Sequence, residues 1–212
     1  EIKLNSKIIK VDTKKIDKFL KKIKNNYFLT ETNKENLSFV LEISKKLNLK
    51  SNLLIKAVKN FKGLRYRQQI IFKKNKLTII NDSKSTSFSS TLGVLKVNPN
   101  IYWLLGGIHK KGDKFNLSKE YFSKIKAFVY GKDNKFFNNE LKNKIKYENF
   151  YNLKDALKKV LMIIKRKKLI HCTILFSPCA ASFDSFKNFE DRGLYFNRLV
   201  KKYFNEKQNI YK

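Results

Sequence analysis

In the second half of the chain, short continuous apolar runs alternate with hydrophobic stripes spaced three or four residues apart. Continuous runs are typical of buried strands, and spaced stripes are typical of helices that cover a sheet. The expected strands are residues 68–72, 77–80, 101–105, 127–130 and 169–176, and the expected helices are residues 87–95, 117–126, 137–141, 153–166 and 183–204. This alternation predicts an α/β fold with a Rossmann-like, mainly parallel sheet and helices on both faces.

The first 62 residues follow a different pattern, in which helices dominate. We expect helices at residues 14–24, 35–47 and 51–61, preceded by a strand at residues 6–11. The pattern changes near Gly63. We therefore expect two regions, a mostly helical one at residues 1–62 and an α/β one at residues 63–212.

Polar and small residues gather where two of the expected strands end. Residues 77–80 run into Asn-Asp-Ser-Lys-Ser-Thr at 81–86, and residues 169–176 run into SPCAASFDSFKNFEDRG at 177–193. We expect Ser182 to cap the last helix. Such a junction points free backbone N–H groups at the crevice beyond the strand, which suits an anion. A well-capped helix without a ligand explains the pattern equally well.

The charge of the chain raises the alternative of a nucleic-acid binder. Lys and Arg number 48 against 17 Asp and Glu, which gives a formal net charge of +31. The basic residues are spread along the whole sequence, however, and most are lysines, whereas base edges and bidentate phosphate contacts favour Arg. We therefore expect no specific nucleic-acid partner, and a basic nucleic-acid-binding α/β module stays as an alternative.

Other function classes find little support. No apolar run approaches the length of about 20 residues that a membrane-spanning helix needs, so we expect a cytoplasmic protein without a membrane partner. Cys172 and Cys179 are expected to be buried small hydrophobes. His109 and His171 belong to no metal-ligand or nucleophile–base spacing, so we expect no metal site among these residues.

Three segments, in this order, resemble the C-terminal domain of the Mur ligase family. They are residues 80–86 (INDSKST), Leu104-Leu105-Gly106-Gly107 followed by Lys110, and the seventeen positions 177–193. The resemblance is narrowest to the branch that adds D-glutamate to UDP-N-acetylmuramoyl-L-alanine in peptidoglycan synthesis. It implies an ATP-dependent, amide-bond-forming ligase that works through an acyl phosphate, with roles in cell shape and cell division. Residues 63–212 would be the C-terminal domain, and residues 1–62 a remnant of the central ATP-binding domain.

The resemblance also implies roles for individual residues. The D-glutamate site would consist of Thr86, Lys110, Ser182, Phe183 and Phe189. The ATP site would consist of Asn33, Asn36, Arg67, Asp82 and Lys84. Arg67 and Lys84 would also be catalytic, because phosphoryl transfer depends on positioned positive charge.

Parts of a complete Mur ligase are missing from the sequence. Residues 107–113 have the glycine spacing of a P-loop, but Asp113 stands where the motif requires Lys. The sequence begins with Glu1, and we expect a C-terminal fragment whose missing N-terminal domains supply most Mg²⁺ ligands and bind the UDP sugar. The fragment would bind D-glutamate and part of ATP, as a monomer that is inactive alone. Another Mur or folylpolyglutamate-type amino-acid ligase is the alternative within enzymes.

Overall fold

The computed structural model describes residues 9–12, 16–166, 171–182 and 185–208. The chain divides into two compact units, Glu1–Lys62 and Gly63–Lys212, called unit 1 and unit 2 below. Each unit has its own hydrophobic core. The two units are therefore described separately.

Unit 1 is helical in its described part. It contains α1 (Ile16–Ile23), a short 3-10 helix (Asn26–Leu29), α2 (Glu31–Lys46) and α3 (Ser51–Asn60). Thr30 begins α2, and its hydroxyl accepts a hydrogen bond from the backbone N–H of Asn33 at 3.4 Å. The core consists of Ile16, Ile23, Phe28, Leu37 and Val58. Residues 9–12 form no strand, so the strand expected at 6–11 is absent from the part of it that is described.

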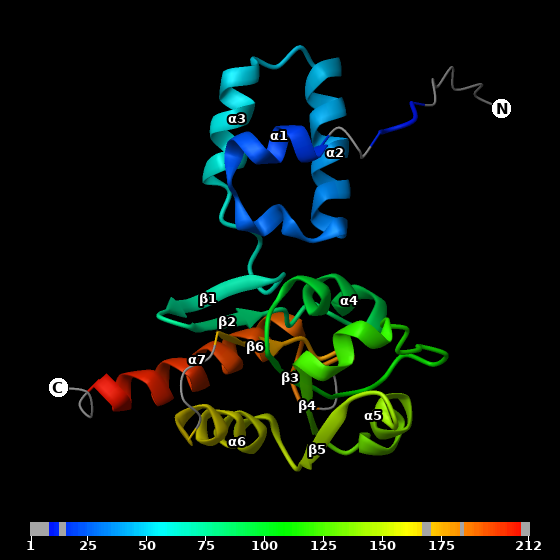
Figure 1. The fold of residues 1–212 in the computed structure, drawn as a ribbon, viewed down its shortest axis with the longest axis vertical. Helices are drawn as coiled ribbons and strands as arrows, with labels where there is room; N and C mark the ends of the chain where they lie inside the picture. The colour runs from blue at the N-terminus through cyan, green and yellow to red at the C-terminus, as the bar shows by residue number, and fades with distance from the viewer. Residues whose placement is uncertain (1–8, 13–15, 167–170, 183–184, 209–212) are drawn as a thin grey trace. The chain divides into compact units, whose positions relative to one another are not determined.

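Unit 2 is built on one six-stranded sheet. Its strands are β1 (Gln69–Lys74), β2 (Leu77–Asn81), β3 (Ile101–Leu105), β4 (Ile125–Tyr130), β5 (Lys146–Phe150) and β6 (Cys172–Phe176). The order across the sheet is β1-β2-β6-β3-β4-β5 (Figure 1). Only β1 runs antiparallel to its neighbour, in a hairpin whose turn places Asn75 at a φ of 52°. The predicted mainly parallel α/β sheet is confirmed.

Helices cover both faces of this sheet, as predicted. α4 (Phe88–Val97) and α5 (Asn134–Leu141) contribute to one core, and α6 (Leu153–Arg166) and α7 (Phe189–Gln208) contribute to the other. Side chains alternate along β3, so that Trp103 enters the first core and Leu104 the second. Both are fully buried, which explains why the parallel strands read as continuous apolar runs.

In the middle of unit 2, one prediction is wrong and one strand was not predicted. The helix expected at residues 117–126 is a 3-10 helix at Lys119–Lys124, and β4 begins at Ile125. Ile125 lies in register with Ile101 of β3, so strand pairing overrides the local helical pattern. β5 lacks the apolar run of the other parallel strands, because it is a polar strand at the edge of the sheet. The Lys126–Glu148 ion pair, with 2.5 Å between Nζ and Oε1, holds it to β4.

The last helix begins later than predicted. α7 starts at Phe189, and residues 185–188 form turns and bends. Asn188, not Ser182, caps it, because the Asn188 side-chain oxygen accepts a hydrogen bond from the backbone N–H of Asp191 at 2.7 Å. The segment between β6 and α7 is therefore a longer loop than the sequence suggested.

Candidate functional site

Three loops leave the carboxyl ends of three neighbouring strands. The β2 loop (residues 82–87), the β3 loop (residues 106–113) and the β6 loop (residues 177–182 and 185–188) follow β2, β3 and β6. These strands are adjacent and parallel in the order β2-β6-β3. The loops therefore emerge side by side at one edge of the sheet, where α/β proteins commonly bind ligands.

The β3 and β6 loops are joined through their backbones. Ile108 and Ala181 exchange N–H···O hydrogen bonds of 3.2 and 2.9 Å, and the N–H of Gly106 donates to the carbonyl of Pro178 at 3.0 Å. Gly106 has a φ of +146°, and a Cβ there would lie 2.0 Å from the carbonyl oxygen of Tyr130. Only glycine fits this position beside β4. At Gly107, a Cβ would lie 2.6 Å from the carbonyl oxygen of Ala181, so this second glycine is the one that lets the β3 and β6 loops approach.

The β2 and β6 loops are joined through buried side chains. Ser177 donates a 2.7 Å hydrogen bond to the Asp82 carboxylate, and the Ser177 and Thr91 hydroxyl oxygens lie 2.6 Å apart. Thr91 also reaches the Ser85 hydroxyl at 2.7 Å and the Cys179 sulfur at 3.0 Å. Burial raises the pKa of the Cys179 thiol, so this cysteine stays a neutral packing group, as expected of a buried small hydrophobe.

The β2 and β3 loops meet at the start of α4. Ser87 caps this helix, and the N–H of Phe88 donates a 2.7 Å hydrogen bond to the Asp113 carboxylate. The N–H of Asp113 in turn donates to the carbonyl of Lys110 at 3.1 Å. Asp113 stands where a P-loop would require Lys. Here it anchors the Lys110 turn to the first turn of α4. All three loops form one hydrogen-bonded unit.

Asp82 holds the β2 loop from the inside. It is 5% exposed, and its two carboxylate oxygens accept hydrogen bonds from the Ser177 hydroxyl and, at 3.0 Å, from the backbone N–H of Gln68. Burial raises the pKa of Asp82 to about 7, although these hydrogen bonds and the nearby charge of Arg67 oppose the rise. The structural role of Asp82 is to fix this turn. A contact with the nucleotide ribose stays a prediction.

Lys84 and Phe189 lie against each other. The Lys84 ammonium is 3.7 Å from the centroid of the Phe189 ring, a cation–π contact between the β2 loop and the start of α7. The backbone N–H of Lys84 donates to the carbonyl of Tyr66 at 3.0 Å. A residue assigned to ATP and a residue assigned to D-glutamate are thus in direct contact.

The remaining predicted site residues of unit 2 differ in exposure. Thr86 and Lys110 are exposed at the loop edge, as is Arg67 just before β1. Ser182 is buried, and its carbonyl accepts hydrogen bonds from the N–H groups of Ser185 and Phe186. Phe183 lies outside the described residues. The structure thus brings the predicted residues of the β2, β3 and β6 loops to one sheet edge, and their binding roles stay predictions.

Asn33 and Asn36 belong to unit 1, on the first half of α2. Asn33 is buried, and its side-chain amide donates a 2.7 Å hydrogen bond to the carbonyl of Tyr27. Asn36 is exposed. The two asparagines therefore differ in environment despite their spacing, and Asn33 already has a structural task in holding the turn before α2.

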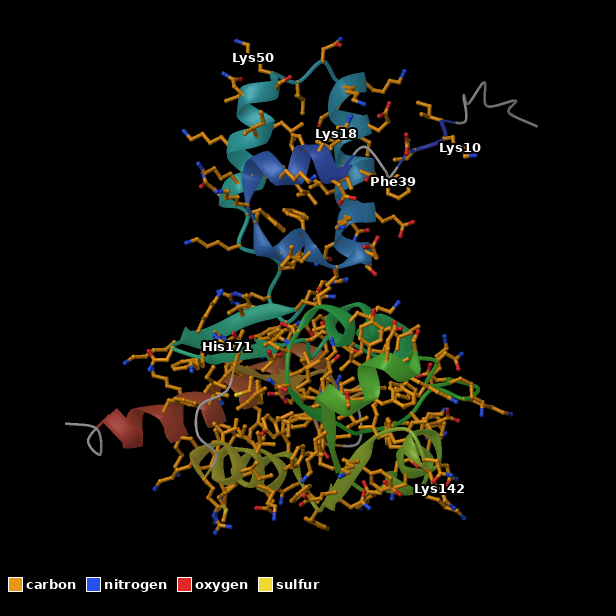
Figure 2. All side chains as sticks on the ribbon, viewed as in Figure 1. Lys10, Lys18, Phe39, Lys50, Lys142 and His171 are labelled. Atoms are coloured by element: carbon orange, nitrogen blue, oxygen red, sulfur yellow. The ribbon has the colours of Figure 1, made fainter. Side chains whose placement is uncertain are left out.

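His109 is a residue of this edge that sequence reasoning passed over. Its Nδ1 contacts the Asp133 carboxylate, and its ring stacks on Phe136 with 3.9 Å between centroids. These partners come from the segment after β4, so no local spacing could have revealed them. His171 lies at the opposite end of β6 (Figure 2), where its carbonyl accepts a hydrogen bond from Asn100.

The described residues contain neither a cluster of metal-ligating side chains nor a helix that could span a membrane. Nowhere in residues 9–12, 16–166, 171–182 and 185–208 do three or more His, Cys, Asp or Glu side chains gather as they would around a metal ion. In the same part of the chain, every helix is too short or too polar to cross a membrane.

Comparison with curated proteins finds similarity over most of the chain. It is 37% identical over 168 residues to the UDP-N-acetylmuramoylalanine–D-glutamate ligase of Wolbachia pipientis wMel, which covers 79% of the chain and 33% of that protein. Against the enzymes of the same name from Rickettsia prowazekii and Francisella tularensis, identity is 36%, over 81% and 80% of the chain and 39% and 41% of the relatives. The chain thus spans between a third and two fifths of these relatives' lengths.

Comparison with solved structures adds the fold. The crystal structure of UDP-N-acetylmuramate-alanine ligase MurC from Thermotoga maritima matches with a TM-score of 0.58 at 16% identity, over 84% of the chain and 39% of that protein. At this identity the match supports the fold alone. No family model matches the chain.

Proposed function

Because the chain is homologous to part of the D-glutamate-adding Mur ligases, we propose that it is the portion of such an enzyme that binds D-glutamate and completes the ATP site. The homology confirms the resemblance predicted from the three motifs. In the complete ligase, ATP phosphorylates the carboxylate of UDP-N-acetylmuramoyl-L-alanine, and the amine of D-glutamate attacks the acyl phosphate. We expect this reaction in the cytoplasm, with a monomeric enzyme.

The observation that carries the proposal is the union of three loops at one sheet edge. Each of the three motif segments contributes to one of these loops, and hydrogen bonds join every pair of loops. Motifs far apart in the sequence would not need such mutual support if each served only its own helix. A shared ligand at this edge explains why the polar groups of all three lie together.

The residues of the loops have the chemistry that a small dicarboxylic acid requires. Lys110 offers an exposed cation and Thr86 an exposed hydroxyl donor, and Ser182 lies on the neighbouring β6 loop. Charge-assisted hydrogen bonds of this kind are the strong ones for carboxylates. Phe189 would supply an apolar wall, and Lys84 beside it would face the phosphates of ATP.

ATP would supply the phosphoryl group, and Arg67 and Lys84 are the cations of unit 2 that we place near it. The described residues contain no cluster of metal-ligating side chains, so no Mg²⁺ step is assigned to this chain. Unit 1 exposes many large apolar side chains, which suits a remnant of a central domain that docks on missing N-terminal domains. Since the chain spans 33% to 41% of the relatives' lengths, we infer that the complete activity also needs the parts of those relatives that it does not match.

Calorimetric titration of the chain with D-glutamate tests the binding proposal. We expect D-glutamate to bind and L-glutamate to bind more weakly. Lys110→Ala should reduce affinity on the order of tenfold to a hundredfold, because one charge-assisted contact is lost. Lys111→Ala is the matched control, since Lys111 is an equally exposed neighbour. Equal effects of the two substitutions would exclude a specific carboxylate site and favour generic polyanion binding.

A coupled phosphate-release assay tests whether the chain needs the N-terminal portion of the ligase for activity. We expect no D-glutamate-dependent ATP hydrolysis by the chain alone. Adding a polypeptide that corresponds to the N-terminal portion of the Wolbachia relative should restore it. If L-glutamate, meso-diaminopimelate or L-lysine replaced D-glutamate with equal rates, another ligase of the superfamily would be the better assignment. Turnover by the isolated chain would contradict the proposal.

A further inference from the structure

Arg192 is one of the largest fully buried side chains of unit 2. It lies in the first turn of α7 and is 1% exposed. Burying a guanidinium is costly unless hydrogen bonds replace its water, and a buried arginine therefore indicates a specific set of acceptors. The position of these acceptors tells what the residue does.

The acceptors lie in two of the three site loops. Nε of Arg192 donates to the Ser83 hydroxyl at 3.1 Å, and Nη2 donates to the Ser83 carbonyl at 2.7 Å. The same Nη2 donates to the carbonyl of Ala180 at 2.9 Å. Ser83 precedes Lys84, and Ala180 lies two residues before Ser182. One side chain thus joins the β2 loop, which carries Lys84 of the ATP set and Thr86 of the D-glutamate set, with the β6 loop, which carries Ser182 of the D-glutamate set.

The third loop packs directly on the same guanidinium. A Cβ at Gly107 would lie 3.4 Å from Nη1 of Arg192, so a side chain at this position of the β3 loop would touch the guanidinium. Arg192 is therefore at the meeting point of the β2, β3 and β6 loops. Lys110, three residues after Gly107, is carried by the same supported backbone.

Neighbouring residues of the same helical turn reinforce this arrangement. The carbonyl of Phe189 accepts a 2.9 Å hydrogen bond from the Ser83 hydroxyl, and the carbonyl of Gly193 accepts one of 2.9 Å from the Asn81 side chain. A Cβ at Gly193 would lie 2.3 Å from the ring of Tyr66, whose carbonyl holds Lys84. The missing side chain at 193 thus lets Tyr66 approach α7.

We propose that Arg192 is a positioning residue that couples the β2 loop, with Lys84 and Thr86, to the β6 loop, with no contact of its own to either substrate. The proposal rests on the proposed function for the identity of the ligands. The geometry of coupling does not depend on that function. When Arg192 is shortened, the Ser83 and Ala180 carbonyls lose a common donor, and the two loops are free to move independently.

Two variants of Arg192, each compared with two control variants on α7, separate a positioning role from a general effect on stability. Arg192→Met removes all three hydrogen bonds, and Arg192→Lys keeps the charge with fewer donors. Arg198→Met is the matched control, because Arg198 is exposed on the same helix. Val200→Ala is the stability control, since Val200 is buried in the core between α7 and the sheet, away from the site loops.

Hydrogen exchange measured by mass spectrometry reports how often the backbone of each loop opens. In Arg192→Met we expect faster exchange of peptides that contain residues 82–86 and 178–182, by about tenfold, because a network of hydrogen bonds is lost. Arg192→Lys should lie between Arg192→Met and the unchanged chain. Val200→Ala should lower the unfolding midpoint yet leave loop exchange unchanged at temperatures well below it.

Calorimetric titration with D-glutamate measures how each substitution changes the affinity for the ligand. Arg192→Met should weaken binding by about tenfold, with partial rescue in Arg192→Lys, and Arg198→Met and Val200→Ala should bind as the unchanged chain does. If Arg192→Met fails to fold, Arg192→Lys carries the test. Unchanged loop exchange in a folded Arg192 variant would overturn the proposal. If the unchanged chain fails to bind D-glutamate, the proposed function fails, and exchange still decides the coupling.

Discussion

Unit 1 and unit 2 differ in how completely they bury their apolar side chains. Among the described residues, unit 1 buries five hydrophobic side chains and exposes ten large ones, whereas unit 2 buries 35 and exposes seven. α2 shows the difference in one helix. Leu37 enters the core, but Val40 and Ile43 lie outside it. Phe39 also lies on the outer side of α2, away from α1 and α3 (Figure 2).

Within the part of the chain that the structure describes, this contrast indicates that the hydrophobic core of unit 2 is the more complete of the two. A parallel sheet covered on both faces satisfies its own apolar surface, and the site loops rest on that rigid support. A few helices with a core of five residues cannot offset the conformational entropy of folding to the same degree. Unit 1 carries the predicted Asn33 and Asn36, and unit 2 carries every other predicted site residue.

Separating the two units gives the largest expected effect. Residues 63–212 alone should unfold cooperatively on heating, and residues 1–62 alone should show no cooperative transition. Trp103, the single tryptophan, is buried in unit 2 and bonds through Nε1 to the Ser177 carbonyl at 2.8 Å, so its fluorescence reports on unit 2 only. The helical circular dichroism signal of the isolated residues 1–62 follows the unfolding of unit 1. A sharp melt of the isolated residues 1–62 would remove the contrast.

Truncating one core residue in each unit sharpens the comparison. Phe176→Ala should lower the free energy of unfolding of unit 2 by about 3–5 kcal/mol, because Phe176 is fully buried and stacks on Phe196 at 4.4 Å between centroids. Leu37→Ala should leave the tryptophan transition unchanged, since Leu37 belongs to the core of unit 1. Urea titration followed by Trp103 fluorescence measures both. A shift of that transition by Leu37→Ala would show that the units fold together.

The buried carboxyl of unit 2 predicts a pH dependence that unit 1 lacks in its described part. The pKa of Asp82 is raised from 3.8 to about 7, so the folded state favours the protonated form. The contribution of the protonated Asp82 carboxyl to the stability of the folded state is therefore fully present below about pH 4. It is lost as the pH rises to about 7. Relative to Asp82→Asn, the unchanged chain should lose on the order of 3 kcal/mol over this range. Urea titrations at pH 5 and pH 8 test this, and an identical stability difference at both values would contradict it.

Changing the exposed apolar face of α2 should have the smallest effect on stability. Phe39→Ser and Ile43→Ser should each alter the free energy of unfolding by less than about 0.5 kcal/mol, because both side chains are largely exposed. They should reduce self-association of the chain, since large exposed apolar patches promote it. Sedimentation velocity over a range of concentrations measures this. Leu157→Ser, in the core of unit 2, is the contrasting variant and should unfold that unit.

The sequence determined the layers of unit 2 and the family of its motifs. Apolar runs are a strong signal for buried parallel strands, and α6 was predicted at the residues where it occurs because its apolar stripe repeats with helical spacing. The change of pattern near Gly63 lies at the division between the compact units. Local sequence patterns did not predict elements that depend on contacts with distant segments. The polar edge strand β5 and the start of α7 are the examples.

Only the tertiary structure decided how the motifs support one another. Nothing in the spacing of Asp82, Ser177 and Thr91 shows that their side chains meet, because strand order, not sequence separation, brings the β2 and β6 loops together. The same holds for Asp113 at the start of α4 and for Arg192 under the loops. A sequence records which groups are available, and long-range packing selects which of them become buried partners and which stay at the surface for a ligand.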